Sequence, residues 1–442
     1  MVLYLMQSSQ RISYNFALKK AIEISNTIKK PLIVLFVITK FPNANASHYK
    51  FMIEGLKEAS KELRERKIKF SVKINEDIFD EFIKYEKHCD YIVLDKGYLK
   101  FHKLLYNRIF NHCEKNKVVQ IEDNVVIPVE EASNKEEYSA ATFRRKISSK
   151  IDERVLDFYL EDIKINSLNI QFDGEIDLEK TTFEDIMKKL KLKEDKVINY
   201  NFKGGYSNSL KNLKDFLENK IKYYEEKRNF PELDYQSNLS PYIHFGNISP
   251  LEILFHCMKQ NYKSRDAFLE ELIVRRELAV NFVYYNKNYD NIFCLNEWAY
   301  KTLKEHESDE RKFIYSLEEL ENAKTHDVYW NAAQKEMIST GKMHGYMRMY
   351  WGKKIIEWTQ KIEEAYNTAI YLNDKYELDG RDANGYTGIA WCFGKHDRAW
   401  KERYIFGKIR YMNDKGLERK FDIKKYASKF NGGWKNEKYA WN

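Results

Sequence analysis

Residues 1–128 alternate short apolar runs with longer amphipathic stretches, and this alternation constrains the fold more than any other feature. The apolar runs are rich in β-branched residues, as buried strands are, and occupy residues 2–6, 31–37, 68–74, 90–94 and 117–121. The stretches between them have helical periodicity and occupy residues 13–28, 48–66, 78–87 and 101–114. Strands that alternate with helices form a parallel sheet covered on both faces. The chain is therefore predicted to begin with an α/β domain built on a doubly wound parallel sheet.

The remaining residues have a different, almost wholly helical pattern. A chain of 442 residues exceeds the size at which a single core stops growing, about 250–300 residues, so we expect two domains. The predicted division is a Rossmann-like α/β domain at 1–130, a charged connector at 131–200 and an all-α domain at 201–442. In the last of these, helices are expected at residues 208–227, 250–261, 265–285, 317–321, 330–340 and 346–371. The α/β domain lacks GxGxxG after its first strand, and the chain has no GxxxxGK[ST], so neither fingerprint indicates a nucleotide there.

Several classes of protein are disfavoured by what the chain lacks. No apolar run approaches the roughly 18 residues of a membrane-spanning helix. The five cysteines form no CxxC pair, which argues against a zinc site or a disulfide framework and favours a reducing compartment. They are Cys89, Cys113, Cys257, Cys294 and Cys392. The chain also lacks HExxH and GxSxG, so we expect neither a metal centre nor an acyl nucleophile.

The C-terminal region combines positive charge with aromatic residues. Residues 391–442 hold 14 Lys+Arg against 6 Asp+Glu. The aromatic residues among them include Tyr404, Phe406, Tyr411, Tyr426, Phe430 and Trp434. Cations that follow phosphates and rings that stack on bases are typical of a nucleic-acid-binding surface. A solvated, lysine-rich surface is the alternative.

All eight tryptophans lie in the last third of the chain. They are Trp298, Trp330, Trp351, Trp358, Trp391, Trp400, Trp434 and Trp441. Trp351 and Trp358 are seven residues apart, which places them on one face of a helix. From spacing alone, a packed seam between helices is as good an interpretation as a functional cluster of rings.

The order of residues around these tryptophans carries a family resemblance. The runs MHGYMRMYW at 343–351 and DGRDANGYTGIAW at 379–391 resemble the paired signatures of class II cyclobutane pyrimidine dimer photolyases. The similarity extends from the MQSSQR run at residue 6 to the GKIRYMN run that ends at residue 413. It implies a helical C-terminal domain that binds FAD, active as FADH⁻, and an α/β domain that hosts an antenna chromophore. The antenna would be of deazaflavin or folate type, and the residues do not identify it.

A flavin site follows from the resemblance. Residues 237–240 (SNLS) combine hydroxyl and amide side chains with a helix start, a weak sign of an anion cradle by itself. The resemblance assigns this loop to the FAD diphosphate, Arg348 and Asp379 to the flanks of the isoalloxazine ring, and Asn373 to flavin N5. Position 385 is Gly where other photolyase classes have Asn, which supports class II. The implied cofactor-binding residues are Tyr224, Ser237, Asn238, Leu239, Ser240, Arg348, Asn373 and Asp379.

Substrate and electron-transfer residues are also implied by the resemblance. Met349 and Trp391 would line the pocket of the damaged bases, Arg228 would face DNA, and Glu271 would bind the pyrimidine dimer. Glu277 is the competing choice for that carboxyl group. Other photolyase classes carry a Trp just after this Glu, whereas this chain has Val274-Arg275. The resemblance therefore does not identify the residue that forms the second wall of the pocket. Trp351 and Trp330 match the electron relay, with Trp358 as a possible branch.

The function implied is light-driven repair of cyclobutane pyrimidine dimers in DNA by electron transfer from excited FADH⁻ to a flipped-out dimer. A cryptochrome-type photoreceptor without repair activity is one alternative, and a colourless enzyme with an α/β domain is another. We expect damaged DNA as the partner, no obligatory protein partner, a monomer, and a cytoplasmic or nuclear location.

Overall fold

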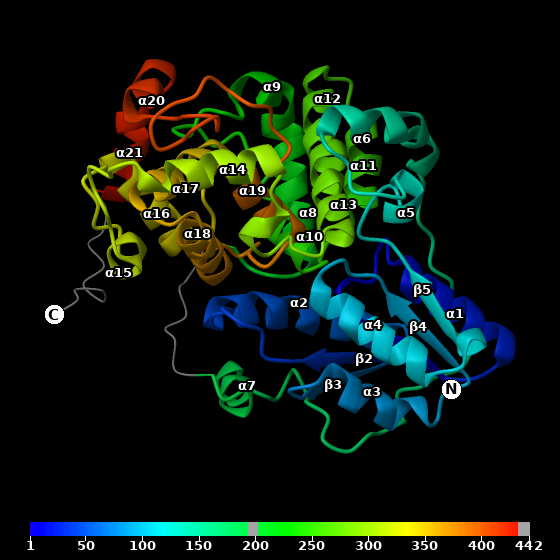
Figure 1. Cartoon of the computed structure of the whole chain (residues 1–442). Coiled ribbons are helices and arrows are strands. Elements are labelled where there is room, and N and C mark those ends of the chain that lie inside the picture. Colours follow the sequence, from blue (N-terminus) through cyan, green and yellow to red (C-terminus); the bar gives the residue numbers. More distant parts are fainter. Residues whose placement is uncertain (193–201, 432–442) are drawn as a thin grey trace.

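The computed structural model describes residues 1–192 and 202–431, in two parts that lie one above the other (Figure 1). The lower part contains the sheet and the upper part is helical. The expectations that concern Trp434 and Trp441 lie outside the described residues.

The lower part confirms the predicted doubly wound sheet. Its strands are β1 (Val2–Leu5), β2 (Leu32–Ile38), β3 (Lys69–Ile74), β4 (Tyr91–Asp95) and β5 (Val118–Ile121). All neighbours pair in parallel, in the order β3-β2-β1-β4-β5. The helices between them are α1 (Phe16–Ile28), α2 (Ala46–Glu65), α3 (Ile78–Glu86) and α4 (Lys100–His112). Because α1 and α2 pack on one face and α3 and α4 on the other, the central strands are apolar on both sides.

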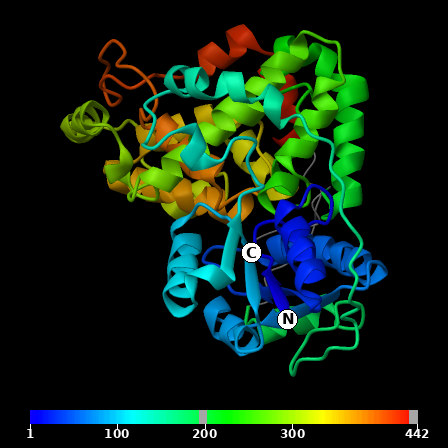
Figure 2. The same cartoon turned by 90° about the vertical axis from the view of Figure 1, so that its right-hand side faces the viewer.

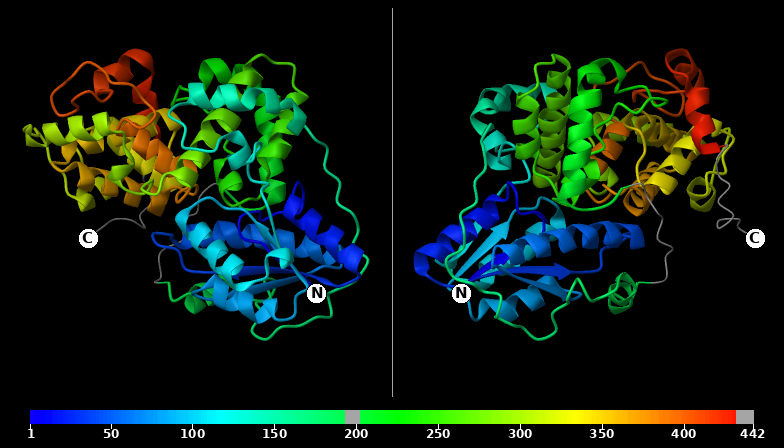
Figure 3. Two further views of the ribbon diagram at one scale, coloured as in Figure 1. Left: turned by 45° about the vertical axis from the view of Figure 1, so that its right-hand side comes forward. Right: turned by 180° about the vertical axis from the view of Figure 1, so that it is seen from behind.

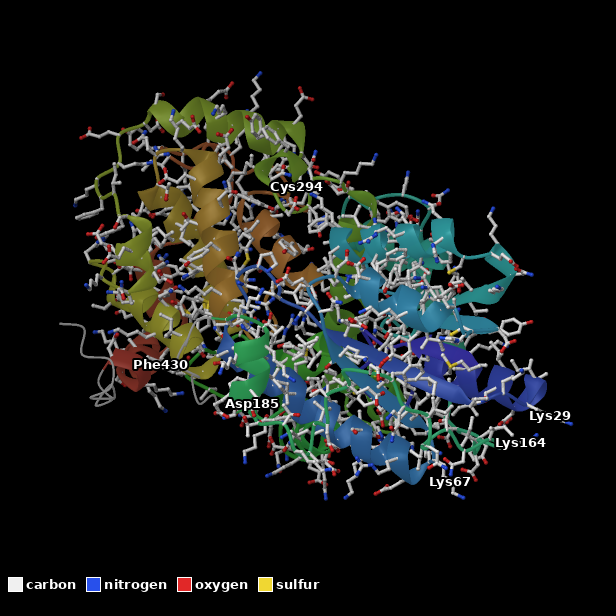
Figure 4. All side chains as sticks on the ribbon, turned by 90° about the horizontal axis from the view of Figure 1, so that it is seen from below. Lys29, Lys67, Lys164, Asp185, Cys294 and Phe430 are labelled. Atoms are coloured by element: carbon white, nitrogen blue, oxygen red, sulfur yellow. The ribbon has the colours of Figure 1, made fainter. Side chains whose placement is uncertain are left out.

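The connector does more than join two domains. After β5 the chain first passes to the helical part, where α5 (Val129–Ala132) and α6 (Ala140–Ile147) lie against it (Figures 2 and 3). It then returns beneath the sheet, with Lys164 near Lys67 and Asp185 on α7 (Phe183–Lys189) further along (Figure 4). The Ile176 N–H donates to the Val72 carbonyl at 2.8 Å. The connector thereby covers β3, an edge strand that would otherwise expose unpaired backbone groups.

The upper part is helical, as predicted, but with more and shorter helices. They are α8 (Tyr206–Asp215), α9 (Tyr224–Lys227), α10 (Ser240–His244), α11 (Pro250–Met258), α12 (Ser264–Leu269), α13 (Arg276–Tyr285), α14 (Glu297–Glu305), α15 (Leu317–Glu321), α16 (Val328–Thr340), α17 (Gly345–Trp358), α18 (Ile362–Tyr376), α19 (Ala383–Cys392), α20 (Asp414–Lys420) and α21 (Ile423–Asn431). None of the helices described here is long and apolar enough to cross a bilayer.

Three of the expected long helices are interrupted. Wider π turns at Phe216–Lys220 and Glu270–Arg275 break two of them. The predicted helix over 346–371 is two helices, α17 and α18. The buried carboxylate of Glu307 accepts the Ile362 N–H at 3.0 Å and so caps α18 from a distant part of the chain. Such a contact leaves no trace in local periodicity.

Candidate active site

An arginine held between two carboxylates forms the centre of the site. Arg348, on α17, donates to Glu377 at 2.7 Å and to Asp379 at 3.1 Å, both in the segment after α18. Its Nε donates to the Met343 carbonyl at 3.1 Å. The structure thus brings Arg348 and Asp379 together, as the sequence predicted. Glu377, whose side chain is 1% exposed, was missed because it lies outside the signature runs.

Burial and charge act differently on the two carboxyl groups. For Asp379, burial opposes ionisation, but the Arg348 cation and the Ser240 side chain outweigh it, so the pKa is lowered. For Glu377, burial dominates, the neighbouring Asp379 adds to it, and the pKa is raised despite Arg348. Asp379 is therefore the ionised partner of Arg348, and Glu377 is the carboxyl group that takes up a proton first.

The 237–240 loop lies against this ion cluster. Asn238 adopts a left-handed backbone conformation, with φ of 56°, and its amide group donates to Asp234 at 3.2 Å. Its side-chain oxygen accepts a hydrogen bond from Lys342. With Ser240 beside Asp379, the loop and the Arg348 cluster form one site. Within this loop, the side chain of Leu239 is buried and packs in the core.

Lys342 is a second residue that the sequence reasoning missed. It follows Gly341, the residue that ends α16 with φ of 73°, and the chain turns there toward the loop. Within the described residues Lys342 forms no ion pair, and its hydrogen-bond partner is the neutral amide of Asn238. Burial, reinforced by the positive charge of Arg348, lowers the pKa of Lys342 to about 8. This partly exposed cation, which has acidic residues near it but no direct ion pair among the described residues, can pair with a negatively charged group bound in this site.

Replacing Lys342 with Met should therefore have two opposite effects. The unliganded protein should become more stable at pH 7, by about 1–2 kcal/mol, because a partly desolvated cation is removed. In the wild type, the unfolded chain holds the Lys342 proton more tightly than the folded protein. The free energy of unfolding should therefore rise from about pH 8 to about pH 10.4, and this rise should be smaller in Lys342→Met. Affinity for an anionic cofactor should fall.

Urea unfolding of the apoprotein at several pH values and a titration with FAD measure these effects. Lys353 is a matched control, because its buried ammonium group also has a pKa lowered by burial to about 8 but bonds to the Cys392 carbonyl, away from the loop. Lys353→Met should leave FAD affinity unchanged. Equal losses of FAD affinity in both variants would contradict the assignment of Lys342.

Asn373 is an interior residue of α18 rather than a helix cap. It is 6% exposed, and its amide group lies against α19 at Gly385. A Cβ at position 385 would come within 2.9 Å of the Asn373 side-chain nitrogen, so the Gly at 385 and the Asn at 373 fit each other sterically. One turn further along α19, Gly388 is exposed and a Cβ there would meet nothing within 4 Å. Gly388 therefore leaves the surface of α19 open at this turn.

The two candidate dimer-binding carboxyl groups have different environments. Glu271 pairs with Arg228 at 2.5 Å, and both side chains are about one third exposed, at 37% and 29%. Tyr224 lies under the Arg228 guanidinium, 5.6 Å from carbon to ring centre. Glu277, in contrast, is 2% exposed and accepts the backbone N–H groups of 126 and 127, which ties the helical part to the segment after β5. The alternative prediction that Glu277 binds the dimer is therefore wrong, because its buried carboxylate already accepts two backbone hydrogen bonds.

The helices that carry Trp391 and Met349, α19 and α17, pack against each other. The thiol of Cys392, next to Trp391, lies 3.8 Å from the Met349 sulfur. Trp391 is partly exposed, and the guanidinium of Arg275 lies over its ring at 5.4 Å.

The three predicted relay tryptophans are in ring contact. Trp351 and Trp330 are stacked, with centroids 6.4 Å apart and planes within 6°. Trp330 and Trp358 meet edge to face at 5.5 Å. The indole N–H of Trp330 donates to the Trp351 carbonyl, and that of Trp351 donates to Gln334 at 2.8 Å. Trp330, from α16, therefore lies between the two tryptophans that share a face of α17, and all three are buried.

A separate cavity of about 490 Å³ lies where the two parts meet. It opens at the carboxyl ends of β1, β2 and β4, where the strand order reverses: the chain runs from β1 through β2 to β3 on one side and then crosses to β4 on the other side of β1. Parallel α/β sheets bind ligands at this position. Its lining includes His48, Lys96, Tyr98, His244, Arg276 and Asp382.

Comparisons with known proteins agree with this architecture. The profile of the DNA photolyase family matches residues 2–156. The deoxyribodipyrimidine photo-lyase of Methanothermobacter thermautotrophicus is 48% identical over 98% of this chain and 94% of that protein. The enzymes of the same name from Oryza sativa and Potorous tridactylus are 40% and 38% identical, over 97% and 96% of this chain and 87% and 80% of their own.

Solved structures share the fold at low sequence identity. A class III photolyase from Agrobacterium tumefaciens superimposes with a TM-score of 0.73 at 18% identity, over 97% of this chain and 86% of that one. An archaeal photolyase from Sulfolobus tokodaii gives a TM-score of 0.70 at 17% identity, over 97% and 89%. With full-length relatives at 38–48% identity and the same two-part fold, the chain belongs to the DNA photolyase family.

Proposed function

We propose that this protein is a light-driven DNA repair enzyme that splits cyclobutane pyrimidine dimers with a bound FAD. The observation that carries the proposal is the adjacency of three features in the helical part. These are the Arg348 cluster with the 237–240 loop, the stacked tryptophans that begin on the same helix at Trp351, and the partly exposed surface at Trp391. The full-length relatives named deoxyribodipyrimidine photo-lyase support the same reaction.

The residues present fit FAD. The loop offers hydroxyl and amide groups, Lys342 offers a cation without an ion pair among the described residues, and the buried Nε2 of His344 has no hydrogen-bond partner among them. Gly388 leaves open space on α19. The residues that would hold the cofactor are Tyr224, Ser237, Asn238, Leu239, Ser240, Lys342, Arg348, Asn373 and Asp379. Excited by light in its reduced form, FAD supplies the electron that splits the two bonds between the joined pyrimidines.

The chain's own residues would prepare this reaction. Arg348 contributes a fixed positive charge that favours an anionic cofactor, and its two carboxylate partners hold its position. Trp391 offers a flat apolar surface on which a flipped base can stack, and Met349 fills space beside it. Glu271 can accept an N–H of a pyrimidine if it exchanges its contact with Arg228. Flipping costs less for a dimer than for an intact base, because the dimer already disturbs stacking.

Finer assignments belong to the same proposal. The complementary Asn373 and Gly385 support class II within the family. The cavity between the two parts could hold an aromatic antenna chromophore, since it combines apolar walls with cationic side chains. We expect a monomer that acts on DNA in a reducing compartment, and the five cysteines are buried and free.

An absorption spectrum and a repair assay test the proposal. Purified protein, reconstituted with FAD where necessary, should show flavin bands. After chemical reduction it should remove dimers from irradiated DNA under blue light and not in the dark. Flavin bands without light-dependent repair would support the cryptochrome-type alternative, and a colourless protein that does not take up FAD would exclude both.

A further inference from the structure

The π turn Glu270–Arg275 carries Glu271, which is assigned to the dimer, and an arginine that lies over Trp391, another residue assigned to the substrate. Glu271 and Arg275 are four residues apart and similarly exposed, with 37% and 38% of their side chains accessible. The guanidinium carbon of Arg275 lies 5.4 Å from the centre of the Trp391 ring. Arg275 thus covers the surface on which a flipped base is proposed to stack.

The guanidinium of Arg275 is anchored on one edge only. Its Nε donates to Glu270 at 3.2 Å. Glu270 is itself fixed by Arg144, whose Nε and Nη2 donate to its two oxygens at 2.9 and 2.5 Å. Within the part of the chain that the structure describes, the two terminal amino groups of Arg275 have no hydrogen-bond partner. The side chain is therefore held near Trp391 while two of its nitrogens remain available to a ligand.

A guanidinium group has the shape and the donors to hold a pyrimidine. It is planar, it stacks on aromatic rings and bases, and its N–H groups match carbonyl oxygens. Pyrimidine dimers keep the carbonyl oxygens of both bases. A lysine would provide charge but no planar group.

We propose that Arg275 forms the second wall of the dimer pocket, so that a flipped pyrimidine lies between its guanidinium plane and the Trp391 ring. This inference rests on the proposed function. On entry the base replaces the Arg275–Trp391 contact, the Glu270 contact keeps the arginine within reach, and its free amino groups bond to base carbonyls. Arg275 is then a contact to the lesion and not to a phosphate.

The affinity for DNA, measured in the dark, distinguishes a contact of Arg275 to the lesion from a contact to a phosphate. The substrates are a duplex with one thymine dimer, its undamaged counterpart, and the damaged duplex with 2-aminopurine opposite the lesion to report flipping. Arg275→Ala should weaken binding of the damaged duplex at least about 10-fold, in line with the loss of one stacking partner. It should reduce the 2-aminopurine signal, leave undamaged DNA unaffected and leave the salt dependence unchanged. Arg275→Lys, which keeps the pair with Glu270 and protects the fold, should behave like Arg275→Ala.

Arg398 is the matched control, because its guanidinium also lies 5.4 Å from a tryptophan ring, that of Trp400 in the basic C-terminal region. Arg398→Ala should weaken both duplexes alike and reduce the salt slope by about one. The same behaviour in Arg275→Ala would overturn the proposal in favour of a phosphate contact, and wild-type binding by either Arg275 variant would also overturn it. Failure of the proposed function would look different, since the wild-type protein itself would then not repair dimers.

Discussion

Replacing Arg348 with Ala is expected to lower the free energy of unfolding by about 3–5 kcal/mol and to abolish stable flavin binding. The substitution leaves Glu377 and Asp379 without their cation, although their side chains are 1% and 11% exposed. Removing one partner of a buried ion pair costs this much because the remaining charge is neither solvated nor paired. Urea unfolding of the apoprotein and the flavin content of purified protein measure the two effects.

The pH dependence of Arg348→Ala has a definite sign. Without the cation, both carboxyl groups should bind protons more tightly in the folded than in the unfolded protein, since burial raises their pKa values. The variant should therefore recover stability as the pH falls from 7 toward 5, and Glu377→Gln in the same protein should recover part of it at pH 7.

Arg64→Ala is the control for Arg348→Ala, because it breaks an ion pair that is exposed rather than buried. It pairs with Glu179 at 2.9 Å, but the two side chains are 52% and 58% exposed. Arg64→Ala should change the free energy of unfolding by no more than about 1 kcal/mol and leave flavin binding intact. If Arg348→Ala is as stable as Arg64→Ala, the cluster is a solvated pair and does not organise the site.

Local pattern was sufficient to predict the α/β fold. Each strand lies between two layers of helices, so its residues are apolar without interruption, and each helix has a single apolar face. Length and β-branching then distinguish strand from helix. The same reasoning was weaker in the helical part, where the start of α18 depends on Glu307 and the π turn before Arg276 depends on no sequence signal that we can name.

The candidate site residues came from the family resemblance rather than from local pattern, and the most ordered motifs carried most of them. Arg348, Asp379, Trp351 and Trp391 lie within the two signature runs. Glu377 and Lys342 lie just outside the two signature runs. Their roles follow from burial and from partners distant in sequence. Glu277 illustrates the converse, because the sequence could not separate it from Glu271 as the dimer-binding acid until its hydrogen bonds to the backbone were known.

Trp351→Phe is expected to block light-driven reduction of the oxidised cofactor while leaving repair by chemically pre-reduced enzyme largely intact. Phenylalanine retains an apolar ring in the core but is far harder to oxidise than indole, so only electron supply is removed. Trp330→Phe should act in the same direction but less completely, because Trp351 remains as the first donor and loses only its stacked neighbour.

Two controls separate electron transfer from packing in Trp351→Phe. The substitution also leaves the Gln334 oxygen without its indole donor, which should destabilise the protein by about 1–3 kcal/mol. Gln334→Leu breaks the same hydrogen bond but keeps the indole, so it should lose stability and still photoreduce. Trp298→Phe changes a tryptophan outside the contacts that link Trp351, Trp330 and Trp358, and should photoreduce normally. Steady blue illumination with an external reductant, followed by an anaerobic repair assay of pre-reduced protein, gives both readouts. If Trp351→Phe photoreduces at the wild-type rate, the stacked tryptophans are a packing seam and electrons reach the site by another route.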